Sequence, residues 1–512
     1  MLTVHRSLYF RFSTLSESLV HLHRRTYTVS RRLAMATHYN AVIIGSGQGG
    51  TPLSMAFAKA GRKTALVEST HIGGCCVNEG CTPTKTMIAS GRVAYLARRG
   101  PDYGILNPTH EHVLVSMEKV RQRKRDMVDS FRSGSERRVR EAGVDLLMGS
   151  ASFQNETTIK VNGHDGAEKM LTADKIFICT GERSAAPQID GFEAAKFPPG
   201  TLLDSTSIQE LETVPSHLII VGGGYIGLEF GQLFRRLGAE VTVIQRNSQL
   251  LPREDKDVAE EMLKILEEDG VKVLLQTFPV AVQATGDGDF TKAITVSASG
   301  RDGASQITAS HVLFATGRTP NTDSLNLEAA GINTTHRGHV IVDQTLQSSN
   351  RRVWALGDVK GPPAFTHVSY DDFRLLRANL LEQGSHPTVL TTVDRILPYV
   401  VYTDPQLAHV GLHEHEARTK FPSARIQVAS MPMAYVARAL ETDESRGMMK
   451  AVIDAETEHI LGFTCLGLEG GEIMSVVQMA MIAGSKWTAL RDAVWAHPSL
   501  AESLNNIWTT LK

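Results

Sequence analysis

The chain has 512 residues, of which 42% are hydrophobic and 21% are charged, and its formal net charge is −2. A chain of this length exceeds what one hydrophobic core can hold, so we expect several domains. A net charge near zero gives no reason to expect a nucleic-acid partner, and no apolar run of about 18 residues is present that could span a membrane.

The first 34 residues differ in composition from the rest of the chain. They are rich in arginine, serine and threonine and contain one acid, Glu17. This composition is typical of a mitochondrial transit peptide. We therefore expect residues 1–38 to be a transit peptide or disordered leader, and the protein to lie in the mitochondrial matrix. Met35, just before the first predicted strand, leaves a shorter cytoplasmic product as the alternative.

The segment after this leader has the pattern of a dinucleotide-binding unit. A short apolar strand at 40–44 leads into a glycine-rich turn, a helix and a second strand. Gly45 allows the tight turn, Gly47 lets the backbone approach a pyrophosphate, and Gly50 lets the helix pack closely on the strand. Glu68 ends the second strand, where a carboxylate accepts hydrogen bonds from ribose hydroxyls.

The same pattern returns between two further predicted strands, at 217–221 and 240–244. Gln245 takes the place that Glu68 holds in the first unit, and Arg246 follows it. A carboxylate would repel a 2′-phosphate, whereas an arginine pairs with it. We therefore expect NADPH as the preferred coenzyme of this unit, with NADH possible. The glycines of its turn are Gly222, Gly224 and Gly227.

Three of the five cysteines gather just after the first unit, in "HIGGCCVNEGCTPTK" at 71–85. A metal site, a structural disulfide and a redox centre could each explain such a cluster, although five cysteines in so long a chain are not a disulfide scaffold. Two dinucleotide sites beside cysteines indicate an electron relay, in which a nicotinamide delivers hydride, a flavin accepts it and a disulfide takes the electrons onward.

The cysteine segment resembles the redox-disulfide signature of the class I pyridine nucleotide–disulfide oxidoreductases, the family of glutathione reductase, dihydrolipoamide dehydrogenase and mercuric reductase. The resemblance runs from about residue 39 to 510 and includes "ICTG" at 178–181, "FATGRTPN" at 314–321 and "ALGDV" at 355–359. It implies an α/β fold with two doubly wound, Rossmann-type domains and an α+β C-terminal dimerisation domain. It also implies an FAD-dependent NAD(P)H:disulfide oxidoreductase that acts as a homodimer on a small disulfide.

The resemblance, more than the composition, sets the expected domain boundaries. The FAD-binding domain is split into 39–190 and 319–390, because the NAD(P)H-binding domain at 191–318 is inserted into it. The dimerisation domain follows at 391–512.

By the same resemblance, Cys76 and Cys81 form the redox disulfide. Cys81 lies next to the flavin as the charge-transfer thiolate, and Cys76 attacks the substrate. Five residues on a regular helix would hold the two sulfurs too far apart, so the helix start must be distorted, and Pro83 helps because it cannot donate a helical hydrogen bond. A zinc site would need more Cys or His at ligand spacing, and none is nearby, so no metal is expected. Cys75 is an additional thiol without an assigned role.

Further roles follow from matching motifs. Lys85 approaches the flavin ring and pairs with Glu229, and Tyr225 covers the nicotinamide pocket. The remaining expected cofactor contacts are Thr180, Gly181, Gly317, Arg318 and Asp358.

The C-terminal "WAHPSLAE" supplies the family's acid–base dyad as His497 and Glu502, with the histidine reaching the cysteines of the other subunit. A histidine can protonate a departing thiol, and a carboxylate can orient it. The wording is most similar to mercuric reductase, but the vicinal cysteine pair at its C-terminus is missing. A mercuric-reductase-like metal or quinone reductase, dihydrolipoamide dehydrogenase and a redox-sensing flavoprotein are therefore the alternatives.

Overall fold

The computed structural model describes residues 36–512 apart from 107–112, 286–292, 302, 383, 385–387 and 394. The predicted leader falls almost wholly outside these residues, and the first strand already begins at Thr37. Among the helices described, none is both long enough and apolar enough to cross a bilayer.

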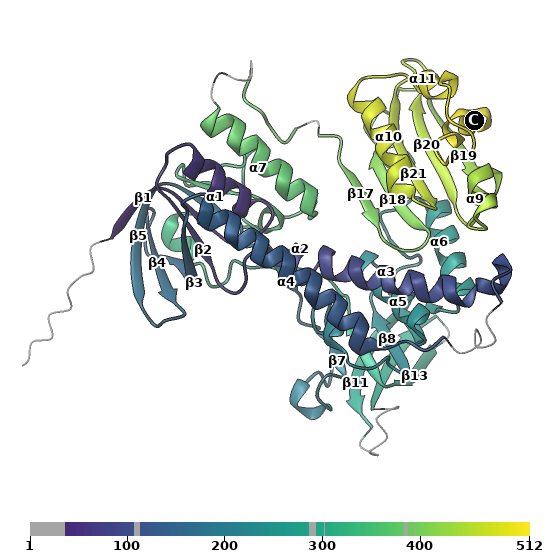
Figure 1. Ribbon diagram of the computed structural model, residues 1–512, viewed down its shortest axis with the longest axis horizontal. Helices are drawn as coiled ribbons and strands as arrows, with labels where there is room; N and C mark the ends of the chain where they lie inside the picture. Colours follow the sequence, from purple (N-terminus) through teal and green to yellow (C-terminus); the bar gives the residue numbers. More distant parts are fainter. Residues whose placement is uncertain are drawn as a thin grey trace, which may run out of the picture. The chain divides into compact units, whose positions relative to one another are not determined.

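The first sheet consists of parallel strands in the order β3-β2-β1-β5-β16, with β4 paired antiparallel to the outer halves of β3 and β5. The central strand β2 is buried along its whole length, as expected for a strand covered on both faces. Helices α1 and α7 lie side by side against this sheet (Figure 1). The elements are β1 (Thr37–Ile44), α1 (Gly50–Lys59), β2 (Thr64–Glu68), β3 (Asp145–Phe153), β4 (Thr158–Gly163), β5 (Glu168–Ile178), β16 (Val353–Ala355) and α7 (Thr366–Leu381).

The second sheet is also parallel, in the order β10-β9-β8-β14-β7, and a three-stranded antiparallel sheet β11-β12-β13 accompanies it. The predicted strands at 217–221 and 240–244 are β8 and β9. The elements are β7 (Leu202–Leu203), β8 (His217–Val221), α5 (Tyr225–Leu237), β9 (Glu240–Ile244), α6 (Lys256–Glu268), β10 (Lys272–Leu274), β11 (Thr277–Ala284), β12 (Ile294–Gly300), β13 (Gly303–Ala309) and β14 (His311–Phe314).

Two connections join these sheets. Strands β6 (Glu182–Ser184) and β15 (Arg318–Pro320) pair antiparallel where the chain passes between them. Helix α3 (Cys81–Arg98) packs on both α4 (Met117–Glu141) and α5, and contributes Met87 to the core of the second unit. The cysteine-bearing helix is therefore held between the two nucleotide-binding units.

The C-terminal part is an antiparallel sheet, β17-β18-β21-β20-β19, with α10 packed on β18 and β21 (Figure 1). Together with the two parallel sheets it confirms the predicted fold class. The elements are β17 (Pro398–Val401), β18 (Gln406–Gly411), α8 (Glu414–Lys420), β19 (Ile426–Pro432), α9 (Ala437–Glu441), β20 (Met448–Asp454), β21 (Ile460–Gly467), α10 (Gly470–Ile482), α11 (Trp487–Asp492) and α12 (Ser503–Asn506).

Candidate active site

The first glycine-rich turn is closed toward the sheet and open on its other side. A Cβ added at Gly45 would lie 2.5 Å from the carbonyl oxygen of Cys179, and one at Gly50 would lie 2.1 Å from the oxygen of Gly45. At Gly47 the nearest atom to such a Cβ is 3.9 Å away. This shape leaves room for a pyrophosphate beside the backbone, so the loop fits the ADP half of FAD.

Glu68 is buried behind this turn. Its Oε2 accepts hydrogen bonds from the backbone N–H of Ser46 (3.0 Å) and from the Ser46 hydroxyl (2.6 Å), and its Oε1 accepts from the N–H of Thr70 (2.8 Å). The carboxylate therefore fixes the turn as well as standing at the strand end where a ribose would lie.

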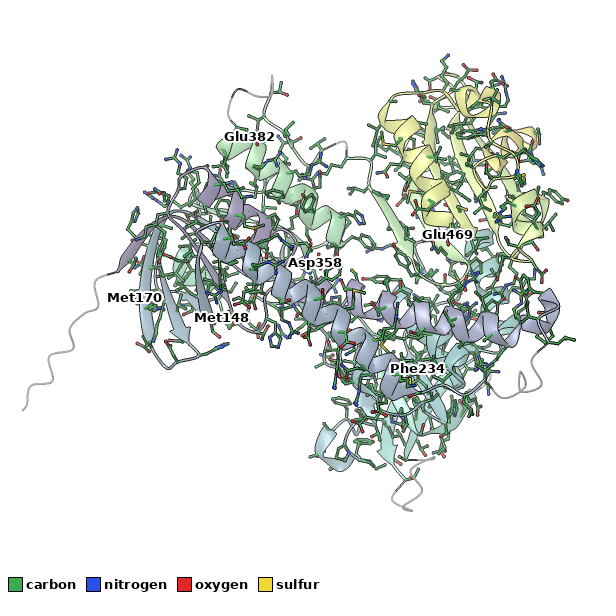
Figure 2. All side chains as sticks on the ribbon, viewed as in Figure 1. Met148, Met170, Phe234, Asp358, Glu382 and Glu469 are labelled. Atoms are coloured by element: carbon green, nitrogen blue, oxygen red, sulfur yellow. The ribbon has the colours of Figure 1, made fainter. Side chains whose placement is uncertain are left out.

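A second group of predicted contacts lies at the ends of β5 and β16. The hydroxyl oxygen of Thr180 is buried without a hydrogen-bond partner, so it can bond to a ligand. Asp358, labelled in Figure 2, follows β16. Burial, with a contribution from the nearby Glu182 carboxylate, raises the pKa of Asp358 to about 6. An unpaired hydroxyl and a poorly compensated carboxyl suit a polyhydroxylated chain such as the ribityl group of FAD.

The second glycine-rich turn repeats the construction of the first. A Cβ at Gly222 would lie 2.4 Å from the oxygen of Ala315, one at Gly227 would lie 2.1 Å from the oxygen of Gly222, and Gly224 faces open space. A cavity of about 1200 Å³ opens in front of this turn. Exposed Arg246 lines the cavity, whereas buried Gln245 turns its amide to the carbonyl of Gln249 (3.1 Å).

The cysteine segment is two helices with a break between them. Helix α2 (Gly74–Asn78) ends before Glu79, and α3 begins at Cys81. The N–H groups of Glu79 and Gly80 both donate to the carbonyl of Cys75, at 2.9 and 2.7 Å. The expected distortion is therefore present, and it brings the free thiols of Cys76 and Cys81 within hydrogen-bonding reach of each other.

The two sulfurs have opposite acidities. The hydrogen bond from Cys76 lowers the pKa of Cys81 to about 6 against the effect of burial, and Thr366 and Lys85 add to this lowering. The same hydrogen bond, together with burial, raises the pKa of Cys76. Near neutral pH the pair therefore holds a thiolate at Cys81 and a protonated thiol at Cys76. The start of α3 at Cys81 also favours the thiolate.

Thr366 was not predicted from the sequence. Its hydroxyl lies 3.2 Å from the sulfur of Cys81, at the first residue of α7. The two residues are 285 positions apart, so no local motif links them. The only signal in the sequence is a threonine at the start of a helix that follows the "ALGDV" motif.

Lys85 and Glu229 form an ion pair between α3 and α5. The Lys85 ammonium lies 2.8 and 3.0 Å from the two carboxylate oxygens, and Glu229 also accepts from the N–H of Tyr402 (2.8 Å). Although burial opposes the charge, the Glu229 carboxylate raises the pKa of Lys85. The ammonium therefore stays charged beside the Cys81 sulfur.

Tyr225 and Arg318 line a smaller cavity of about 220 Å³. Tyr225 is the first residue of α5, and its ring lies 6.1 Å from that of Phe365. Arg318 donates to the carbonyl of Glu182 (2.6 Å), and its guanidinium lies 3.6 Å from the sulfur of Cys75. Among its described contacts, Cys75 is thus paired with Arg318 and has no hydrogen bond to the other two thiols. Gly181 and Gly317, both at positive φ, face open space.

The His497–Glu502 pair lies in the C-terminal part. Nδ1 of His497 is 2.9 and 3.0 Å from the two carboxylate oxygens of Glu502, and the imidazole is largely exposed. Within the described residues of this single chain, no contact joins His497 to Cys76 or Cys81. The imidazole of His497 is therefore oriented and accessible, but within the described part of one subunit it does not contact the redox cysteines.

Comparison with known proteins agrees with this architecture. Residues 39–372 match the family model "Pyridine nucleotide-disulphide oxidoreductase", and 397–507 match the dimerisation domain of the same family. A probable pyridine nucleotide-disulfide oxidoreductase, RclA, of Escherichia coli is 35% identical over 478 residues, covering 93% of this chain and 99% of its own. A mercuric reductase of Bacillus cereus is 33% identical over 467 residues, covering 91% and 70%.

A solved structure also matches. The Cu(II) complex of the HOCl-induced flavoprotein disulfide reductase RclA from Escherichia coli superimposes with a TM-score of 0.81 at 34% identity, covering 92% of this chain and 99% of that one.

These relatives correct one prediction. The mitochondrial matrix location predicted from the first 34 residues is wrong, because the similar proteins are bacterial enzymes and point away from it. An arginine-rich, acid-poor composition fixes only the net charge of a segment. It does not by itself establish in which compartment a protein lies.

The two nucleotide cradles, the paired thiols between them and the matches over nearly the whole described chain lead to one conclusion. The chain belongs to the pyridine nucleotide-disulphide oxidoreductase family and is an FAD-dependent NAD(P)H:disulfide oxidoreductase.

Proposed function

We propose that the protein reduces a small disulfide with electrons from NADPH, as a homodimer in which each active site uses His497 of the other copy. The observation that carries this proposal is the asymmetry of the thiol pair. The pKa of Cys81 is lowered to about 6 and that of Cys76 is raised. Cys81 is thus already a thiolate near neutral pH, whereas Cys76 needs a base to remove its proton before it can attack.

On the flavin side, the chain's residues hold charge in place. FAD, when bound, accepts hydride from the nicotinamide and exchanges electrons with the cysteine pair. Lys85, fixed by Glu229, and the hydroxyl of Thr366 stabilise the negative charge on Cys81. Thr180 and Asp358 supply polar contacts for the cofactor, and Tyr225 lines the neighbouring cavity.

On the substrate side, His497 removes the proton from Cys76, whose sulfur then attacks one sulfur of the substrate disulfide. A Cys76–substrate bond forms, the substrate S–S bond breaks, and the leaving thiolate takes the proton back from His497. The Cys81 thiolate then attacks the Cys76 sulfur, which re-forms the Cys76–Cys81 disulfide and releases the second sulfur as a thiolate that takes its proton from solvent. Glu502 orients the imidazole throughout.

Dimerisation is supported by two observations. Residues 397–507 match a dimerisation domain. Large apolar side chains on this part of the single chain are exposed, among them Met479, Ile482 and Val494, as expected where a partner covers them.

The test is His497→Ala, with exposed His459→Ala as a matched control in the same part of the chain. Oxidised glutathione, cystine, lipoamide and an aromatic disulfide serve as substrates, and ferricyanide serves as an acceptor that needs no thiol protonation. We expect kcat with the best disulfide to fall about 100- to 10,000-fold, as for loss of a general acid–base. Ferricyanide reduction should stay within about twofold of the parent. Disulfide turnover that survives His497→Ala would contradict the proposal.

A second candidate is reduction of a soft metal ion. It is favoured by the mercuric reductases among the relatives and by the Cu(II) complex of the similar RclA. In that reaction Cys76 and Cys81 would both bind the ion as thiolates. No thiol leaving group then needs a proton, so NADPH-dependent reduction of Hg²⁺ or Cu²⁺ should survive His497→Ala.

A further inference from the structure

A second cluster of titratable side chains lies apart from the thiols. Glu254, just before α6, His409, on β18, and His413, just before α8, each present one ligand atom, and these atoms lie within 4.8 Å of one another. All three residues are buried. Residues from the nucleotide-binding part and from the C-terminal part meet here, and the redox chemistry proposed above uses none of them.

Two polar atoms of this cluster lack partners. Oε1 of Glu254 accepts a hydrogen bond from the Tyr399 hydroxyl, but Oε2 is buried with no partner. Nδ1 of His413 faces the backbone N–H of Glu416 in a capping arrangement at the start of α8, but no hydrogen bond of good geometry forms there. These two atoms are 3.9 Å apart. Two buried acceptors left in this way are costly, and a positive charge between them would remove the cost.

Lys450 does not supply that positive charge. Lys450 is the nearby ammonium, and it lies 3.2 Å from Asp255, 3.0 Å from Asp257 and 2.9 Å from Glu414. Its charge is therefore already shared among three other carboxylates. Glu254 remains the carboxylate of this region that has only a hydroxyl to bond.

The spacing suits a metal ion. Zinc lies about 2.0–2.2 Å from carboxylate oxygens and about 2.0–2.1 Å from imidazole nitrogens. A tetrahedral ion with these bonds holds its ligand atoms about 3.4 Å apart, so Oε2 of Glu254 and Nδ1 of His413, which are 3.9 Å apart, would draw together by about half an ångström to share one ion. In His409, Nε2 faces the carbonyl of Gly411 (3.1 Å). A carbonyl on one ring nitrogen is the usual arrangement of a metal-ligating histidine, and it leaves Nδ1, now beside the Thr464 hydroxyl (2.8 Å), as the ligand.

We propose that Glu254, His409 and His413 form a binding site for a divalent transition-metal ion of the Zn²⁺, Co²⁺ or Cu²⁺ class, separate from the redox thiols. Two imidazoles and one carboxylate form a donor set that binds such ions in preference to Mg²⁺ or Ca²⁺. The rings of His409 and His413 stack with centroids 3.7 Å apart and planes 14° apart. Sharing one ion therefore requires one ring to turn about its Cβ–Cγ bond.

His415 is an exposed neighbour of this site. It is mostly exposed, its ring stacks on that of His413 with centroids 5.7 Å apart, and its Nδ1 is 3.2 Å from a carboxylate oxygen of Asp255. A bound ion would tie the loop before α6 to β18 and α8, so it would clamp the nucleotide-binding part to the C-terminal part.

The experiment uses the FAD-loaded full chain carrying Cys76→Ser and Cys81→Ser, so that the redox thiols cannot bind metal. The protein is freed of metal with a chelator and dialysed against Co²⁺ or Zn²⁺, and bound metal per flavin is measured. We expect one ion per chain, with visible Co²⁺ bands free of thiolate charge transfer. Glu254→Gln and His413→Gln, made in this background, should each weaken binding at least tenfold, whereas the exposed His459→Gln should not.

No stoichiometric ion in the parent, or equal binding in all variants, would overturn the proposal. If either cluster variant loses its flavin or its near-ultraviolet circular dichroism, Cu²⁺ electron paramagnetic resonance of the parent decides. Splitting from two imidazole nitrogens supports the site. A bound-copper signal without it, or no bound copper, refutes the site and leaves a hydrogen-bonded cluster that shares protons.

Discussion

The two nucleotide-binding units have the same backbone plan and differ at one strand end. In both, a glycine at the end of the turn packs so tightly that a Cβ would lie 2.1 Å from the carbonyl of the turn's first glycine. In the first unit the strand ends in Glu68, buried and bonded to its own turn. In the second, the amide of Gln245 donates to the carbonyl of Gln249, and Arg246 is exposed at the cavity.

The glycines and the residue at the strand end have separate roles. The glycines make a cradle that any dinucleotide phosphate can enter, because backbone N–H groups and a helix N-terminus carry no preference for the rest of the molecule. We propose that the charge at the strand end then selects the nucleotide. The first unit also continues directly into the cysteine helices, whereas the second contributes Glu229, which holds Lys85 of those helices.

The largest expected effects come from substitutions that block one glycine-rich turn at a time. Gly50→Ala should give protein with little bound FAD and no turnover, because its Cβ would overlap the Gly45 carbonyl. Gly227→Ala should keep the yellow flavin but lose kcat/KM for NADPH by roughly 100-fold. Flavin absorbance of the purified proteins and steady-state kinetics measure both changes. If both variants lost the same function, the two units would not be assigned correctly.

The next effect concerns coenzyme choice. Arg246→Ala should lower kcat/KM for NADPH by about 10- to 100-fold, the loss expected for a charge-assisted phosphate contact, and change the value for NADH by less than about threefold. Gln245→Glu should act in the same direction by repulsion. Parallel kinetics with the two coenzymes check this, and an equal loss for both would show that Arg246 does not contact a 2′-phosphate.

A smaller effect is expected at the matching position of the first unit. Glu68→Gln replaces an oxygen that accepts two bonds from Ser46, or the one that accepts from Thr70, by an amide nitrogen that cannot accept. Affinity for FAD should fall about tenfold, since hydrogen bonds to a charged group contribute about 1.5–3 kcal/mol. Equilibrium dialysis measures it, and Glu68→Asp is the graded control. Unchanged affinity would restrict the role of Glu68 to folding.

The smallest expected effect is a shift in the pKa of Cys81, in the thiol pair that the first unit has and the second unit lacks. The pKa of Cys81 is lowered to about 6, so the thiolate is present above that pH and is lost as the pH falls through it. Thr366→Ala removes one stabilising hydrogen bond and should raise this pKa by about 0.5–1 unit. The long-wavelength absorbance of the two-electron-reduced enzyme, titrated with acid, reports the midpoint. Thr366→Ser should restore it, and an unmoved midpoint in Thr366→Ala would contradict the contact.

Sequence reasoning was strong where structure is local. The strands at 217–221 and 240–244 have the predicted bounds because buried parallel strands are short, mostly apolar runs. The break between α2 and α3 agrees with the distortion expected if Cys76 and Cys81 pair, as the family resemblance implies. It was weak where contacts join distant positions. Nothing near Cys81 in the sequence indicates Thr366, and Glu254 and Tyr399, which meet in the buried histidine cluster, are 145 positions apart.

Glu229 has a consequence for engineering the enzyme. Exchanging the second nucleotide-binding unit for one from another dehydrogenase is an obvious way to change coenzyme preference, since the cradle is self-contained. Glu229, however, lies on α5 of that unit and bonds both Lys85 and the N–H of Tyr402. A transplant without a glutamate at this position would leave the partly buried ammonium of Lys85 beside Cys81 without its counter-charge. The second unit therefore cannot be exchanged on its nucleotide-binding residues alone, because it also supplies a residue to the cysteine site. A chimera that keeps Glu229 should retain turnover, whereas a chimera with glutamine at this position should lose it.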